Sequence, residues 1–242
     1  MSTSGKKASE FFAASKDNDL SSKAHRQLVG VSGLLLPILV WLVAGTRPIE
    51  DMPSWELLTS VSAYYHTGAV AVYAGILIAL AYFLFSYRGY NKPYLRRERV
   101  ATIIAGLAAV FVAFFPTVVP PGAAEIIWWT EPIGKIHFVS SVVLFGAFVF
   151  FTLFLFPKSN VKKGNPLPKG KKIRNGIYYF CGVAMVGCLV WALIAAWKDT
   201  SMFWPESLAL VFFAVSWLVK GRTEVTLIAV GRRIRHFGRA PK

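Results

Sequence analysis

The sequence predicts an all-α integral membrane protein with six transmembrane helices. The chain has 242 residues, of which 55% are hydrophobic and only 16% are charged, whereas a soluble domain carries about 25% charged residues. Six apolar stretches of 18 to 21 residues are present, close to the roughly 20 residues that cross a bilayer as a helix. The stretches lack the period-two alternation of barrel strands, so helices are the structure that satisfies the backbone within lipid.

These stretches divide the chain into three parts. A polar tail of residues 1–27 comes first, a membrane domain of residues 28–219 follows, and a basic tail of residues 220–242 ends the chain. The first and last spans have 18 residues each, so each is expected to extend into a flanking turn. The predicted spans, in order, are residues 28–45, 67–87, 100–119, 136–156, 177–197 and 202–219.

The distribution of basic residues predicts the orientation. In a six-span threading, 24 of the 27 Lys and Arg residues fall on one side of the membrane. The other side holds Arg47, Lys135 and Lys198 together with seven acidic residues. Because Lys and Arg collect in cytoplasmic loops, both termini are predicted to lie in the cytoplasm.

The net charge of +15 therefore follows from topology and does not predict nucleic-acid binding. Membrane lipids are the expected partners. The tail of residues 220–242 mixes apolar and Arg residues, a composition typical of a helix lying on anionic lipid of the inner leaflet. The sequence leaves open whether copies of the chain form a homo-oligomer.

One short motif suggests an enzyme but is better explained by packing. Gly30-Val31-Ser32-Gly33 has the form seen around a serine nucleophile. Ser32 lies near the inner end of the first span, whereas His66 and His137 lie at outer ends, so a Ser–His proton transfer is excluded. Small residues at this spacing indicate a helix–helix contact instead.

A polar cluster is predicted at the outer ends of the second and fourth spans. In α-helical geometry Ser62 and His66 share one face, as do His137 and Ser141. Tyr65 adjoins the first pair, and the loop before the fourth span adds further polar and aromatic groups. The candidate binding residues are Ser62, Tyr65, His66, Glu125, Glu131, His137 and Ser141.

Three interpretations of this cluster stay open. The aromatic residues and histidines form an interfacial belt, or they line an outward-facing site for a cation, a proton or a polar head group. In the third, His66 and His137 hold zinc with Glu125 or Glu131 and activate water. The leading prediction is transport, ion or proton permeation, or sensing without a cofactor; the alternative is a metal-dependent hydrolase acting on lipid head groups. The residues do not decide whether the chain is an enzyme.

Several segments resemble a set of uncharacterised bacterial six-helix membrane proteins. They are Ser-x-Ser-x-Tyr-Tyr-His-Thr at 60–67, Tyr-Arg-Gly-Tyr at 87–90, Phe-Pro-Thr at 115–117 and Ile-His at 136–137. The resemblance spans about residues 60–160 and implies a multi-pass protein of the bacterial inner membrane. An Arg-Asp pair common in those proteins is replaced here by the uncharged residues 68–71.

Overall fold

The protein is all-helical over the residues that the computed structural model describes, which are 3–46, 55–87, 95–123, 126–158 and 166–222. This part of the chain contains six α-helices and two short helical segments, and no strand. The elements are α1 (Thr3–Thr46), the 3-10 helix η1 (Ser62–His66), α2 (Val70–Ser86), α3 (Leu95–Phe114), α4 (Glu131–Phe150), the π-turn η2 (Phe151–Leu155), α5 (Lys169–Trp197) and α6 (Phe203–Lys220).

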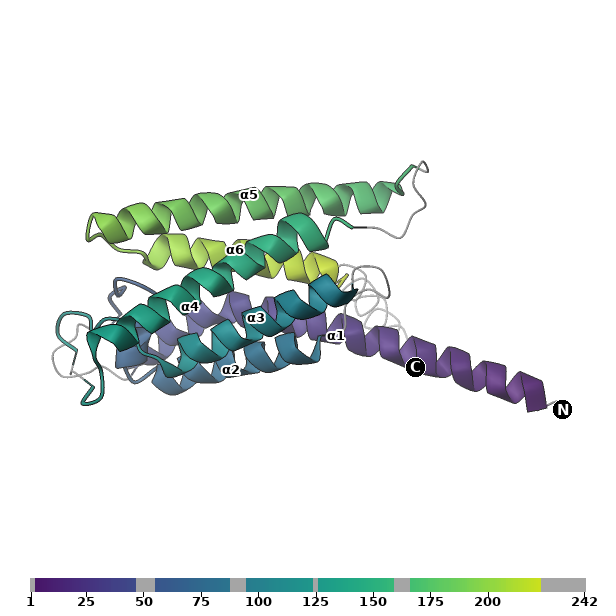
Figure 1. Cartoon of the computed structure of the whole chain (residues 1–242), viewed down its shortest axis with the longest axis horizontal. Helices are drawn as coiled ribbons and strands as arrows, with labels where there is room; N and C mark the ends of the chain where they lie inside the picture. Colours follow the sequence, from purple (N-terminus) through teal and green to yellow (C-terminus); the bar gives the residue numbers. More distant parts are fainter. Residues whose placement is uncertain (1–2, 47–54, 88–94, 124–125, 159–165, 223–242) are drawn as a thin grey trace, which may run out of the picture.

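The helices form an elongated bundle with their axes along its length (Figure 1). α1 packs between α2 and α6, and α3 packs between α2 and α4. α5 lies at the edge of the bundle and packs mainly against α6. From this position α5 contributes Tyr178 and Met185 to the buried core.

Four of the helices are long and apolar enough to cross a membrane. The four segments are Lys23–Thr46, Glu131–Leu155, Lys169–Trp197 and Phe203–Lys220. α2 is apolar but has 17 residues, and α3 carries charged residues in its first turn. α2 and α3 overlap the predicted spans 67–87 and 100–119, but the apolar helical part of each is shorter than the predicted span.

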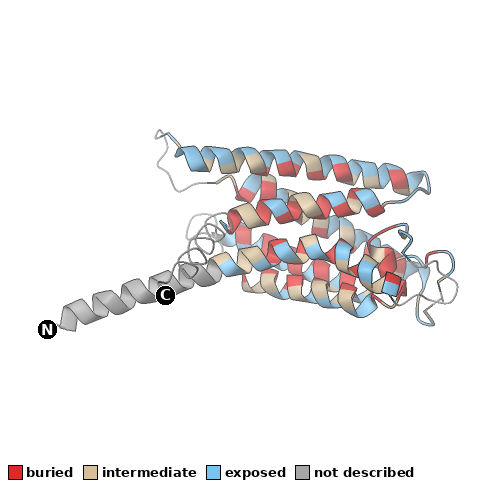
Figure 2. Ribbon diagram, turned by 180° about the vertical axis from the view of Figure 1, so that it is seen from behind, coloured by how far each residue is buried: buried red, intermediate tan, exposed pale blue. Residues whose placement is uncertain are grey.

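The exposed side chains of the bundle are of the kind expected in a membrane protein. Figure 2 shows exposed residues along the whole length of the bundle, and many of them are large and apolar. Phe180 is 67% exposed and Trp197 is 84% exposed, both on α5. An apolar surface of this extent is costly in water and compatible with lipid.

The contact predicted for the first span is confirmed. A Cβ atom at Gly33 would lie 2.6 Å from the Phe213 ring, and one at Gly30 would lie 3.0 Å from the Ala214 carbonyl oxygen. α1 and α6 therefore approach each other at positions where a side chain does not fit. Ser32 lies at this packed junction, as a structural explanation of the motif requires.

Two sequence predictions need correction. His66 lies in η1 and not in α2, which begins at Val70, so Ser62 and His66 do not share an α-helical face. α3 ends at Phe114, before the predicted end at residue 119. The segment predicted as a polar tail, residues 1–27, is helical from Thr3 as the first part of α1, and its polar character stays a prediction from the sequence. Glu125 and the basic tail beyond residue 222 lie outside the described residues.

Candidate functional site

The end of α3 leaves backbone carbonyl groups that need partners. The chain runs without helical structure through Phe115, Pro116 and Thr117. Proline lacks an N–H group and disfavours the helical conformation in the preceding residue, so the helix stops here. A carbonyl group in this position cannot be satisfied by the helix, and lipid offers it no hydrogen-bond donor.

Side chains from η1 and α4 supply the missing donors. His66 donates from Nε2 to the carbonyl oxygen of Thr117 at 2.9 Å, and His137 donates from Nδ1 to that of Phe115 at 2.6 Å. The Tyr65 hydroxyl reaches the Phe114 carbonyl oxygen at 3.4 Å. Three of the predicted site residues thus converge on the end of α3.

The second ring nitrogen of each histidine is buried. Neither His66 Nδ1 nor His137 Nε2 has a hydrogen-bond partner within the described part of the chain. Since the opposite nitrogen of each ring donates its proton to a carbonyl group, these two atoms carry lone pairs. The two rings are near enough to interact electrostatically. Each ring therefore keeps one nitrogen that can accept a hydrogen bond or bind a metal ion.

Burial controls the charge state of His66. The side chain is 7% exposed, and loss of hydration lowers the pKa of its imidazole below the usual value, with the bond to Thr117 opposing the change. The neutral ring is therefore the favoured form in the folded protein.

The carboxylate expected to join the histidines points elsewhere. Glu131 forms an ion pair with Lys135 at 2.7 Å, and its side chain is 76% exposed. Among the residues that the structure describes, no group of three or more His, Cys, Asp or Glu side chains is placed to hold a metal ion. Glu131 is thus a surface residue of the first turn of α4.

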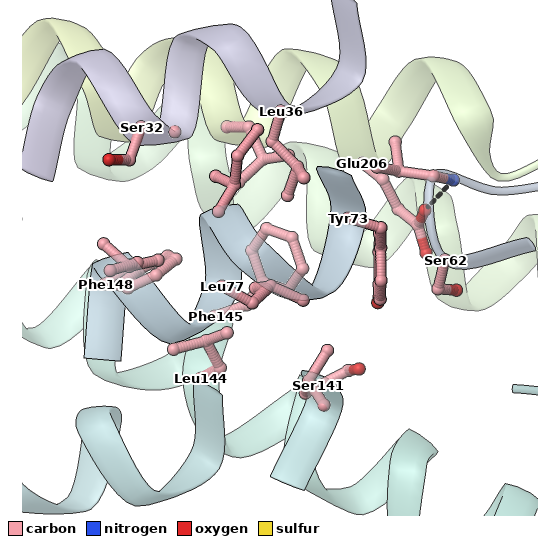
Figure 3. Close-up of a pocket in the computed structure, with 16 residues that line it drawn as sticks. Ser32, Leu36, Ser62, Tyr73, Leu77, Ser141, Leu144, Phe145, Phe148 and Glu206 are labelled. Carbon is pink, nitrogen blue, oxygen red and sulfur yellow. Dashed lines mark hydrogen bonds between the residues drawn. The ribbon is translucent and has the colours of Figure 1, made fainter. Parts of the chain in front are cut away.

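A cavity lies inside the bundle beneath η1 (Figure 3). It has a volume of about 40 Å³ for water-sized occupants, and it is lined by η1 and by every α-helix except α5. The walls are mostly apolar, with Leu36, Leu77, Leu144 and Phe148 among them. The polar lining residues are Ser32, Ser62, Tyr73, Ser141 and Glu206.

Glu206 is the one acidic residue in the cavity lining. Its Oε2 atom accepts a hydrogen bond from the Val61 backbone amide at 2.7 Å, and the Ser62 amide lies beside the same carboxylate. The hydroxyl groups of Ser60 and Ser62 form a hydrogen bond of 3.0 Å at the same turn. The carboxylate therefore holds the start of η1 against α6, with Ser62 and Tyr73 beside it in Figure 3.

Two predicted residues belong to this cavity and not to the histidine contacts. Ser62 lies where the cavity meets η1, and Ser141 lies on α4 one helical turn further along than His137. Ser141 is ten residues from the start of α4, which is about 15 Å along the helix axis. The cavity therefore begins about one helical turn of α4 beyond the histidine contacts.

The sequence favours a structural role for Glu206 at the start of the sixth span over a ligand-binding role, so Glu206 was not among the candidate residues. There a carboxylate is expected to interact with the helix dipole. The signal that identifies it is an acidic residue next to Pro205 at the head of an apolar helix, facing a serine-rich segment.

Comparison of the chain with models of protein families, with curated proteins and with solved structures finds no match.

Proposed function

We propose that the chain is a six-span membrane protein with both termini in the cytoplasm. The start of the apolar part of α1 and the end of α6 are neighbours, since Gln27 donates to the Gly221 carbonyl oxygen at 3.4 Å. The described Lys and Arg residues support the same orientation. All except Lys135 and Lys198 lie at the end of the bundle that contains Gln27 and Gly221. In a bacterial cell this places the chain in the inner membrane.

Within that topology, the proposed function is passage of a proton or small cation through the cavity beneath η1. The observation that carries this proposal is the position of Glu206, a carboxylate in an otherwise apolar cavity between five helices. Acidic groups inside a membrane domain are costly and mark ion or proton pathways. The hydroxyl groups of Ser32, Ser62 and Ser141 supply further oxygen ligands along the cavity wall.

The hydrogen bonds suggest how occupancy of the site controls access. Glu206 holds the start of η1 through the Val61 amide, and the end of η1 holds α3 through His66 and Thr117. A proton or cation on the carboxylate weakens its interaction with the amide groups, because the negative charge that attracts them is neutralised. Release of η1 then opens the outer end of the cavity.

Flux measurement in liposomes tests this function. Reconstituted wild-type protein is expected to pass protons or monovalent cations down an imposed gradient, and Glu206→Gln is expected to abolish the flux. The amide oxygen of Gln still accepts from Val61, so the fold is retained. Glu56→Gln is the matched control, since Glu56 is an exposed acid at the same end. Equal flux in Glu206→Gln and wild type contradicts the proposal.

The topology has a separate test. A cysteine introduced as Thr130→Cys is expected to react with a membrane-impermeant reagent in spheroplasts, and one introduced as Asn165→Cys is expected to be protected. The reverse pattern overturns the orientation. Labelling of both sites or of neither overturns the threading.

One observation favours the alternative of a metal-dependent hydrolase. Metal-binding histidines usually donate the second ring N–H to a carbonyl group, which leaves the other nitrogen as ligand. His66 and His137 both have this arrangement. Stoichiometric zinc in the purified protein, lost in the double variant His66→Gln/His137→Gln, would support that function over ion passage.

A further inference from the structure

The opposite end of the bundle holds a cluster of cations. Lys220, at the end of α6, interacts electrostatically with Arg26 of α1 and with Lys171 and Arg174 of α5. Glu98 of α3 is the acidic residue that acts on Lys220 from this side of the bundle. Lys220 therefore lies among three other cations with one carboxylate nearby.

Aromatic rings hold the cationic groups in place. Trp217 packs against Tyr87 and Phe156, with ring centroids 5.4 Å and 5.1 Å away. The Arg26 guanidinium lies 5.7 Å from the centre of the Tyr87 ring, and the Lys220 ammonium lies 5.0 Å from that of Phe156. Lys171 donates to the Phe156 carbonyl oxygen at 2.9 Å. The cations thus surround one aromatic core formed by Trp217, Tyr87 and Phe156.

Two buried donors in this cluster have no acceptor. Arg26 Nε and Trp217 Nε1 are buried, and neither has a hydrogen-bond partner within the described residues. Trp217 is fully buried and Lys220 is 7% exposed. Arginine, lysine and the indole group donate hydrogen bonds and cannot accept them. Arg26 Nε and Trp217 Nε1 are therefore two donors in a positively charged surrounding that have no acceptor among the described residues.

The positive-inside rule accounts for exposed basic residues in the loops, but it does not account for buried ones. Arg96, Arg97 and Lys172 lie at the same end and are exposed, so water and counter-ions satisfy them. A half-buried group of cations with unpaired donors is costly unless an anion completes it.

We propose that this cluster, defined by Arg26, Lys171, Lys220 and Trp217, binds a phosphate group. A phosphate has several acceptor oxygens and a negative charge, which suits donors that converge from three helices. Either the head group of an anionic phospholipid or a free inorganic phosphate supplies this chemistry. The site lies at the other end of the bundle from Glu206 and is independent of the proposed ion passage.

Thermal unfolding of the purified full chain tests the site in two arms. In neutral detergent, inorganic phosphate is titrated against chloride at equal ionic strength. In nanodiscs, phosphatidylcholine alone is compared with phosphatidylcholine mixed with phosphatidylglycerol. A rise in Tm with phosphatidylglycerol only assigns a lipid head group, and a rise with inorganic phosphate only assigns a soluble anion. A rise in both arms assigns the phosphate group from either source.

Variants decide whether the effect belongs to this cluster. Arg26→Gln is expected to need about tenfold more phosphate or anionic lipid for the same rise in Tm, since one hydrogen bond to a charged group is lost. Lys172→Gln removes the same charge from an exposed position and is expected to behave as wild type. Trp217→Phe removes the indole N–H while keeping an aromatic ring, and is expected to weaken the response as well.

No rise in Tm in either arm overturns the proposal. An equal response in Arg26→Gln, Lys172→Gln and wild type also overturns it, because the effect is then general screening of charge.

Discussion

The two ends of the bundle bury polar groups of opposite character. At the end that holds η1, the outer end in the proposed topology, the histidines hold the end of α3 and keep two ring nitrogens with lone pairs, and Glu206 is a carboxylate. At the other end, the inner end in the proposed topology, the groups around Trp217 without described partners are donors, and Lys220 lies among further cations. A surplus of acceptors suits a proton or cation, whereas a surplus of donors suits an anion. The same helices thus present complementary chemistry on opposite sides of one apolar core.

The polar groups at one end stabilise the bundle, whereas those at the other end lack a partner that a bound ligand would supply. His66, His137 and Glu206 already make backbone hydrogen bonds, so removing them should destabilise the fold. Arg26 lies among like charges, so removing it should relieve repulsion. We therefore expect the free energy of unfolding to fall when His66, His137 or Glu206 is replaced, and to rise when Arg26 is replaced.

The largest expected effect is at Glu206. Glu206→Ala removes the acceptor of the amide groups at the start of η1 and is expected to lower the free energy of unfolding by about 2–3 kcal/mol. Glu206→Gln retains an acceptor oxygen and should lose less than half of that. Denaturant unfolding in mixed micelles measures both. An equal loss in the two variants would show that the carboxylate holds η1 by charge alone.

The next effect is at the histidines. His66→Ala or His137→Ala leaves the Thr117 or Phe115 carbonyl group without a donor, with an expected loss of about 1–2 kcal/mol for each variant. Replacement of either histidine by Gln, which retains a donor, should recover part of this loss. If both Ala variants unfold as wild type does, water or lipid replaces the histidines and the outer end is not held by them.

The inner end should respond with the opposite sign. In neutral detergent without phosphate, Arg26→Gln is expected to change the free energy of unfolding by less than about 1 kcal/mol, and toward greater stability, because repulsion from Lys220 is relieved. In anionic nanodiscs the variant should be less stable than wild type. A large loss in neutral detergent would mean that Arg26 is a structural residue, as the histidines are.

The smallest expected effect is the pH dependence from His66. Burial lowers the pKa of His66 below the unfolded value of about 6.5, so the unfolded chain binds more protons as the pH falls through that range. Stability is therefore complete above about pH 6.5 and decreases on acidification. The fall in Tm should be shallower in His66→Gln and unchanged in Tyr65→Phe. Equal slopes in all three proteins would exclude His66 as the titrating group.

The helical architecture was largely predictable from the sequence because apolar length determines where a membrane helix can form. The predicted contact at Gly30 and Gly33 is confirmed for the same kind of reason, since small residues allow close approach of helices. The breaks in the helices were harder to place. Pro116 indicates the end of α3, but the hydrogen bonds that make an early end acceptable come from His66 and His137, far away in the sequence.

The candidate site was predicted in part. The two histidines were identified from their positions at the ends of apolar spans, and the structure brings them to one segment. Glu206 was not identified, because its partner amides belong to residues 61 and 62, and this pairing depends on how α6 packs against η1. The inner cluster was explained by topology alone, since the sequence does not reveal that Lys220 and Trp217 are buried.

The central claim is that the cavity beneath η1 admits cations because of Glu206, and thiol labelling tests it most directly. Cys181 and Cys188 lie on α5, outside the cavity lining, and both are first replaced by Ser. Ser141→Cys then places a thiol in the cavity. We predict that a cationic methanethiosulfonate reagent modifies it roughly tenfold faster than a neutral reagent of equal size. Glu206→Gln should remove this preference. No labelling at Ser141→Cys, or equal rates for both reagents with Glu206 present, would contradict the account.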